Sequence, residues 1–88
     1  MKLNVIKNEK NYLEIEFLDQ DMAFVNTIAS IALENKDVEF CAAKLDHPEV
    51  SNPVLIIRTK SSSPKKVLIE AAQELKEQIK KLQEGLKK

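Results

Sequence analysis

The sequence predicts an α+β fold in which a four-stranded, mostly antiparallel sheet carries two helices on one face. Three observations indicate this fold. Four short segments with strand character and two helical segments follow one another in the order β-β-α-β-β-α. The second helical segment, residues 63–88, is long and repeats its apolar residues in heptads. The 88 residues contain no linker-like or repeated stretch, so we expect one domain spanning residues 1–88.

The first two strands are predicted at residues 2–7 and 12–18. The second of them alternates clearly, with Leu13, Ile15 and Phe17 on one face and polar side chains on the other. Strict alternation is typical of a strand that buries one face only. The polar residues between the two segments predict an antiparallel hairpin with a four-residue connection.

The first helix is predicted to begin after Asp21, a good N-cap residue, and to run to about Asn35. Apolar side chains occupy most of its circumference, and a helix of that kind is buried on most sides. Because one small sheet covers only one side, we expect a partner to cover another. The amide of Asn26 on this apolar helix needs hydrogen-bond partners, either in a neighbouring loop or in a partner chain.

Two further strands are predicted at residues 37–45 and 54–60. In the former we expect Val38, Phe40 and Ala42 to face the same way. The latter is β-branched and apolar on both faces, which predicts a position inside the sheet. Polar residues and prolines between them indicate a loop.

The terminal helix is predicted to begin at Ser63-Pro64, an N-cap residue followed by the residue best suited to the first helical position. At 1.5 Å per residue it would be about 39 Å long, roughly twice the 15–20 Å width of a four-stranded sheet. We therefore expect its first half to pack on the sheet and its second half to need another chain. The heptad seam consists of Leu68, Ala72, Leu75, Ile79, Leu82 and Leu86.

The charged residues beside this seam are interpreted as a solvated face. The alternative is that they select a partner from flanking heptad positions. The charged residues in question are Glu74, Lys76, Glu77, Lys80, Lys81 and Glu84.

Composition excludes several classes of function. Lys plus Arg and Asp plus Glu both number 14, so the basic surplus typical of nucleic-acid-binding modules is missing. The single glycine, Gly85, cannot build a phosphate-binding loop, and the single Cys41 cannot form an internal disulfide. No stretch is long and apolar enough for a membrane span. We expect a cytoplasmic protein that binds no cofactor and no membrane.

Candidate chemical groups are few and each has a structural interpretation. Cys41, Asp46 and His47 lack recognised metal-ligand spacing, and no base is evident that would make Cys41 a nucleophile. Carboxylates suitable for acid–base catalysis are better explained as a helix cap and a solvent-facing strand edge. These carboxylates are Glu14, Glu16, Asp19 and Asp21.

Three blocks of the sequence follow the pattern of a known family: Asp21-x-x-Phe24-x-Asn26, then Asp37-Val38-Glu39-Phe40 with Ala43-Lys44 and His47-Pro48, and finally Ser63-Pro64. On these blocks the chain resembles the archaeal DNA-directed RNA polymerase subunit L, and the similarity runs over almost the whole chain. Met22-Ala23, Val25 and Lys65-Lys66 depart from the family pattern. These departures concern detail of the helices and leave the architecture unchanged.

The resemblance implies a non-catalytic subunit that pairs with D, the larger alpha-like subunit of the polymerase, to form a platform for assembly of the catalytic subunits. It places the first and last helices at the dimer interface, which agrees with their uncovered apolar faces. A homodimeric regulatory or ligand-binding module using the same helices is the alternative, and a small enzyme on a ferredoxin-like sheet is a more remote one. The expected interface residues are Phe24, Ile28, Ile31, Leu68, Ala72, Leu75, Ile79, Leu82 and Leu86.

Overall fold

The computed structural model describes residues 2–45 and 52–86. The predicted motif His47-Pro48 lies outside the described residues. The element order confirms the predicted β-β-α-β-β-α arrangement. The elements are β1 (Lys2–Glu9), β2 (Tyr12–Leu18), α1 (Met22–Ala32), β3 (Val38–Lys44), β4 (Val54–Thr59) and α2 (Pro64–Leu86).

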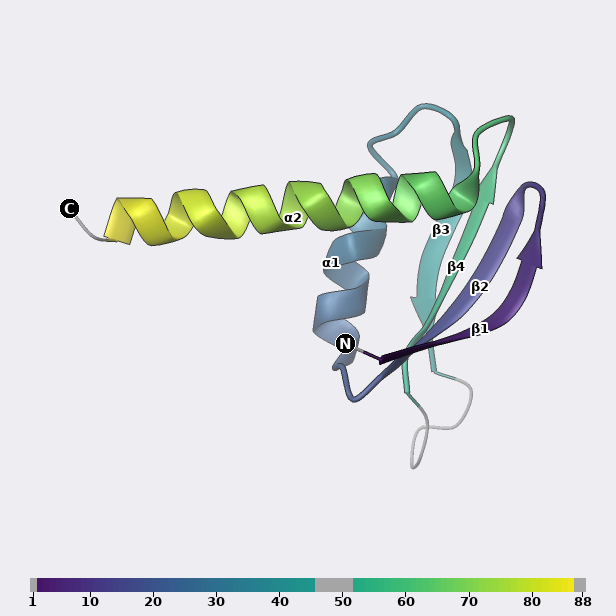
Figure 1. Cartoon of the computed structure of the whole chain (residues 1–88), viewed down its shortest axis with the longest axis horizontal. Coiled ribbons are helices and arrows are strands. Elements are labelled where there is room, and N and C mark those ends of the chain that lie inside the picture. Colours follow the sequence, from purple (N-terminus) through teal and green to yellow (C-terminus); the bar gives the residue numbers. More distant parts are fainter. Residues whose placement is uncertain (1, 46–51, 87–88) are drawn as a thin grey trace.

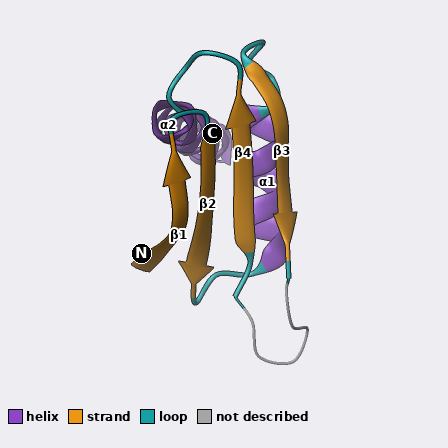
Figure 2. Cartoon of the chain, turned by 90° about the vertical axis from the view of Figure 1, so that its right-hand side faces the viewer, coloured by secondary structure: helices purple, strands orange, loops and turns teal. Residues whose placement is uncertain are grey.

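The four strands form one antiparallel sheet in the order β1-β2-β4-β3 (Figure 2). β4 therefore lies inside the sheet, as its apolar composition predicts, and β1 and β3 are the edges. The β1–β2 connection is a turn at Lys10 and Asn11, tighter than the predicted four residues, because β1 extends further toward it than expected. Leu13 of β2 pairs with Ile57 of β4, so the inward-facing residues of the two central strands stand side by side.

Both helices lie on one face of the sheet, as predicted (Figures 1 and 2). α1 packs along β3 and β4, whereas α2 crosses α1 and then extends away from the sheet. The alternation predicted for β2 is confirmed, since Leu13, Ile15 and Phe17 are all buried. The rest of the core comes mainly from β4 and the two helices, including Val25, Ile28, Ala29, Ala32, Leu55, Ile57, Val67 and Ala71.

The prediction that Val38, Phe40 and Ala42 face the same way is wrong for Val38, whereas Phe40 and Ala42 do share a face, since they pair with Arg58 and Ile56 of β4. A register shift between Val38 and Phe40 places Val38 on the core side together with Cys41, while Phe40 pairs with Arg58 and is exposed on the opposite side. A β-bulge adds one residue to one strand, and one added residue reverses which face each later side chain occupies. Simple alternation cannot reveal such a bulge.

Candidate partner-binding surface

α2 is buried only near its start. Its buried residues are Pro64, Val67 and Ala71, all within the first eight of 23. At 1.5 Å per residue the helix is about 35 Å long. Figure 1 shows the yellow C-terminal half standing clear of the sheet and of α1. The predicted overhang is therefore present in the isolated chain.

The heptad seam starts beside the core and becomes more exposed along the helix. Leu68 and Leu75 are partly buried and pack against the core. Farther out, exposure rises from 47% at Ile79 to 63% at Leu82 and 77% at Leu86. An apolar stripe that leaves its own domain in this way is unusual for a monomeric protein and is typical of an interaction surface.

The most deeply buried residues of α2 lie beside the seam rather than in it. Val67 and Ala71 meet the core, each one position before the seam residues Leu68 and Ala72. Ala72 was expected to pack on the sheet, and it is exposed instead. Successive helical residues differ by 100°, so the core-facing stripe and the seam lie next to each other. Most of the seam is consequently free for another contact.

α1 adds an aromatic ring to this surface. Phe24 is partly buried, and its ring meets Phe17 edge to face, with centroids 6.3 Å apart and an interplanar angle of 69°. This contact anchors Phe24 to the core while part of the ring stays accessible. Beside it lies a hollow lined by Phe24, Ala72, Lys76, Ile79, Lys80 and Gln83.

Two other residues predicted from α1 have different positions. Ile28 is buried in the core, so its side chain is not available on the surface. Ile31 is partly buried and lines a cleft between the two helices. A helix with apolar residues on most sides does not reveal by itself which side meets its own sheet.

Asn26 lies on the solvent-facing side of α1 and is exposed, as are Ala23, Thr27 and Ser30. The hydroxyl of Thr27 donates to the carbonyl of Ala23 at 2.9 Å, a local bond within the helix. Of the two alternatives for the Asn26 amide, the exposed position favours contact with water or another chain over burial against a loop.

The start of α1 is capped as predicted. The carboxylate of Asp21 accepts a hydrogen bond from the backbone N–H of Phe24 at 2.9 Å. Such a bond satisfies one of the helix's free N–H groups. The same residue that fixes the first turn therefore fixes the backbone that carries the Phe24 ring.

The segment before α2 is held by Asp37, a residue that the sequence does not single out for this role. Its carboxylate accepts hydrogen bonds from the hydroxyl and the N–H of Ser61, at 3.0 and 3.2 Å, and from the N–H of Ser62. The hydrogen bonds from Ser62 and Ser61 lower the pKa of Asp37 to about 2. They tie the segment before α2 to the turn before β3. No local sequence signal links residues so far apart in the chain.

Behind this connection, the Ser63 carbonyl accepts the N–H of Val67 at 3.2 Å, which places Ser63 at the predicted cap position before Pro64. Thr59, at the end of β4, is buried, and its hydroxyl is bonded to the carbonyl of Ser62. The junction between sheet and helix is thus held by several hydrogen bonds.

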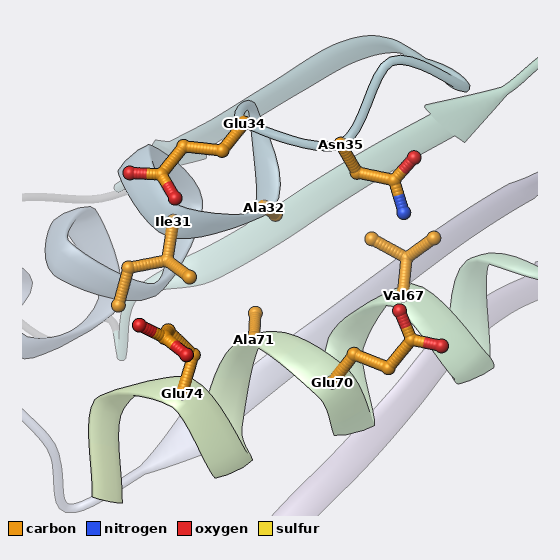
Figure 3. A pocket seen from close by; sticks show the side chains of 8 residues that line it. All are labelled: Ile31, Ala32, Glu34, Asn35, Val67, Glu70, Ala71 and Glu74. Atoms are coloured by element: carbon orange, nitrogen blue, oxygen red, sulfur yellow. The ribbon is translucent and has the colours of Figure 1, made fainter. Parts of the chain in front are cut away.

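A second cleft separates the end of α1 from the first turns of α2 (Figure 3). In Figure 3 the side chains of Val67 and Ala71 point toward α1, and they form the apolar floor with Ile31 and Ala32. The remaining lining residues are polar or acidic: Glu34, Asn35, Glu70 and Glu74.

The candidate chemical groups occupy structural positions. Burial raises the pKa of the Cys41 thiol to about 11, so the reactive thiolate is scarce at neutral pH. Glu14 accepts a hydrogen bond from the Tyr12 hydroxyl at 2.8 Å, and Glu16 accepts one from the Asn4 amide at 3.1 Å. These carboxylates belong to the sheet surface.

Residues 2–45 and 52–86 contain no candidate metal site. No group of three or more His, Cys, Asp or Glu side chains within this part could hold a metal ion. Likewise, no helix there is both long enough and apolar enough to cross a membrane.

Comparison with known proteins gives one consistent result. Residues 12–85 match the family model described as the RNA polymerase Rpb3/Rpb11 dimerisation domain. The chain is 38% identical over 78 residues to the DNA-directed RNA polymerase subunit Rpo11 of Thermococcus sibiricus, a match that covers 85% of this chain and 82% of that protein. It is 33% identical over 91 residues to Rpo11 of Pyrococcus furiosus, covering 100% and 96%.

A solved structure supports the same relationship. The crystal structure of DNA-directed RNA polymerase subunit L from Thermoplasma acidophilum superposes with a TM-score of 0.87 at 26% identity, covering 98% of this chain and 85% of that one. The likeness therefore extends over nearly all of the chain, including both helices.

Proposed function

The chain belongs to the family of RNA polymerase Rpb3/Rpb11 dimerisation domains, and on that premise we propose that it pairs with the larger alpha-like subunit of the polymerase, called the alpha-like partner below. Its relatives are archaeal Rpo11 and L subunits, so it is a non-catalytic subunit of DNA-directed RNA polymerase. We propose that residues 1–88 act as a single dimerisation domain. The resulting heterodimer provides the platform on which the catalytic subunits assemble.

The observation that carries this proposal is the apolar overhang of α2. We call the proposed contact area the helix-side surface. A large apolar side chain gains about 1.5–3 kcal/mol when it moves from water into a protein interior. Several such side chains together give a gross gain on the order of 10 kcal/mol, part of which association entropy cancels. The helix-side surface consists of Phe24, Ile31, Leu68, Ala72, Leu75, Ile79, Leu82 and Leu86.

Two lysines at the edge of the helix-side surface indicate the charge of the partner surface that meets it. Lys76 and Lys80 flank the hollow beside Phe24 and Ile79. A partner that places acidic groups at this rim would gain in association rate and in choice of register. We therefore propose an apolar partner surface whose edge is acidic where it meets these lysines.

The test is co-expression with the alpha-like partner followed by size-exclusion chromatography with light scattering. We expect the two chains to elute as a one-to-one complex. Leu75→Asp or Ile79→Asp should abolish co-purification, because an unpaired charge would be buried in the interface. Normal binding of the alpha-like partner by these variants would contradict the proposal.

A matched control is available on the same helix. Gln73 is exposed and lies about 120° around α2 from Ile79. Gln73→Asp adds the same charge away from the seam, so it should leave the complex intact. The experiment also tests the alternative function, because a second copy of the chain offers the same apolar surface. A stable homodimer that ignores the alpha-like partner would replace the heterodimer proposal by a homodimeric module.

A further inference from the structure

β1 carries a small apolar area on the same side of the sheet as the helices. Leu3 pairs with Phe17 and Val5 pairs with Ile15 in the β1–β2 register. Paired residues of neighbouring strands point to the same face. Leu3 and Val5 therefore face the helix side, as the buried Phe17 and Ile15 do, yet they are 46% and 51% exposed.

These two side chains are exposed because neither helix extends far enough to cover them. α1 packs on β3 and β4, and the contacts of β1 are mainly with β2 (Figure 2). α2 passes the end of the sheet where β1 and β2 join, whereas Leu3 and Val5 lie toward the other end of β1. Leu3 and Val5 are thus two large apolar side chains on the helix side that stay exposed, and their neighbour Ile6, which has no paired residue in β2, is 47% exposed as well.

The overhang of α2 indicates what could cover them. Residues 76–86 extend about 16 Å past the last partly buried seam residue, Leu75. When two domains of like fold pair about a two-fold axis, each presents the same elements to the other. If this helix reaches over the partner domain, the corresponding helix of the partner reaches back over this one.

We propose that Leu3 and Val5 form a second contact area, which is covered by the terminal part of the helix of the alpha-like partner that corresponds to α2. This inference rests on the proposed pairing with that partner. It adds an element that the family match does not include, since that match begins at residue 12, after β1. Leu3 is connected to the helix-side surface through the core, because its partner in the register, Phe17, is buried and meets the ring of Phe24.

The edge of β1 favours a helix over an added strand as the occupant. The register shift between Val5 and Lys7 interrupts the pairing of β1 with β2, and such a bulge bends and twists an edge strand locally. Bulges and lysines on an edge strand hinder pairing with another strand. A helix needs only the apolar side chains on the face and makes no use of the backbone groups at the edge.

The first test compares two adjacent substitutions in β1. Val5→Lys places a charge on the helix side, whereas Asn4→Lys places the same charge on the opposite face, beside Glu16. We expect Val5→Lys to raise the dissociation constant of the complex with the alpha-like partner at least about tenfold, because the lysine charge would be buried in the interface without a counter-charge. Asn4→Lys should change the dissociation constant less than about twofold. Equal effects of the two variants would overturn the inference.

The second test locates the occupant without adding a charge. A photo-crosslinking phenylalanine analogue is placed at position 3, the complex with the alpha-like partner is irradiated, and the linked peptide of that partner is identified by mass spectrometry. A link to the helix that corresponds to α2 supports the inference. A link to a strand of the partner, or no link in an intact complex, overturns it while leaving the pairing itself in place. If the unmodified chain fails to bind the alpha-like partner, both proposals fall.

Discussion

α1 and α2 share one face of the sheet but depend on it to very different degrees. α1 has 11 residues and places buried side chains along its whole length, from Val25 to Ala32. α2 has 23 residues, and its last buried residue, Ala71, is only the eighth from its start. The first helix therefore completes this domain, whereas most of the second is free to contact another one.

This difference separates two kinds of apolar residue that look the same in the sequence. Removing an apolar side chain from α1 costs stability of the isolated chain, since it leaves a cavity in the core. Removing one from the outer half of α2 costs little in the isolated chain, because the side chain is already in water. The same change should appear instead as a loss of affinity for a partner.

The largest expected effect comes from Ile28→Ala in α1. Ile28 is buried and belongs to the core cluster, so the variant should lose about 2–5 kcal/mol of unfolding free energy, the usual cost of such a truncation. Urea denaturation followed by circular dichroism measures this loss.

Leu82→Ala is the matched comparison for Ile28→Ala in α2. Leu82 is mostly exposed, and surface substitutions usually change stability by less than about 0.5 kcal/mol. In a binding titration, however, Leu82→Ala should weaken the complex with the alpha-like partner. A loss of stability as large as that of Ile28→Ala would show that the outer half of α2 folds back on its own domain.

A moderate effect is expected from the cap of α1. Asp21→Ala removes the hydrogen bond to the N–H of Phe24 and should cost about 1 kcal/mol of unfolding free energy. Asp21→Asn keeps a side-chain acceptor and should cost less, which makes it the matched control. Thermal denaturation of the two variants distinguishes them. Equal losses would mean that the charge of Asp21, and not its acceptor geometry, supports the helix.

The sequence predicts much of the difference between α1 and α2, and the features that it does not predict have physical reasons. The order of elements, the Asp21 cap and the overhang all follow from local pattern and length, which are encoded near each residue. The buried position of Ile28 depends on which side of α1 meets the sheet, and a helix with apolar residues on most sides does not reveal that side. The face of Phe40 relative to Val38 depends on a β-bulge, which simple alternation does not reveal. The Asp37 contact joins residues far apart in the chain, so no local pattern reveals it.

The smallest effect is expected where α2 is attached to the sheet. Folding lowers the pKa of Asp37 from 3.8 to about 2, which means that the native state favours the ionised carboxylate that accepts bonds from Ser62 and Ser61. A group with a lowered native pKa stabilises the fold above its unfolded pKa and loses this contribution as pH falls through the native value. Asp37→Asn should therefore be less stable than the parent chain above about pH 4.

The stability difference between Asp37→Asn and the parent chain should shrink as the pH approaches 2, when the parent carboxylate is protonated as well. Urea denaturation of both chains at several pH values from neutral down to about pH 2 measures this convergence. Comparing the two chains at each pH cancels the titration of the other carboxylates, because both chains carry them. A gap that stays constant over this range would show that the ionisation of Asp37 does not hold α2 in place.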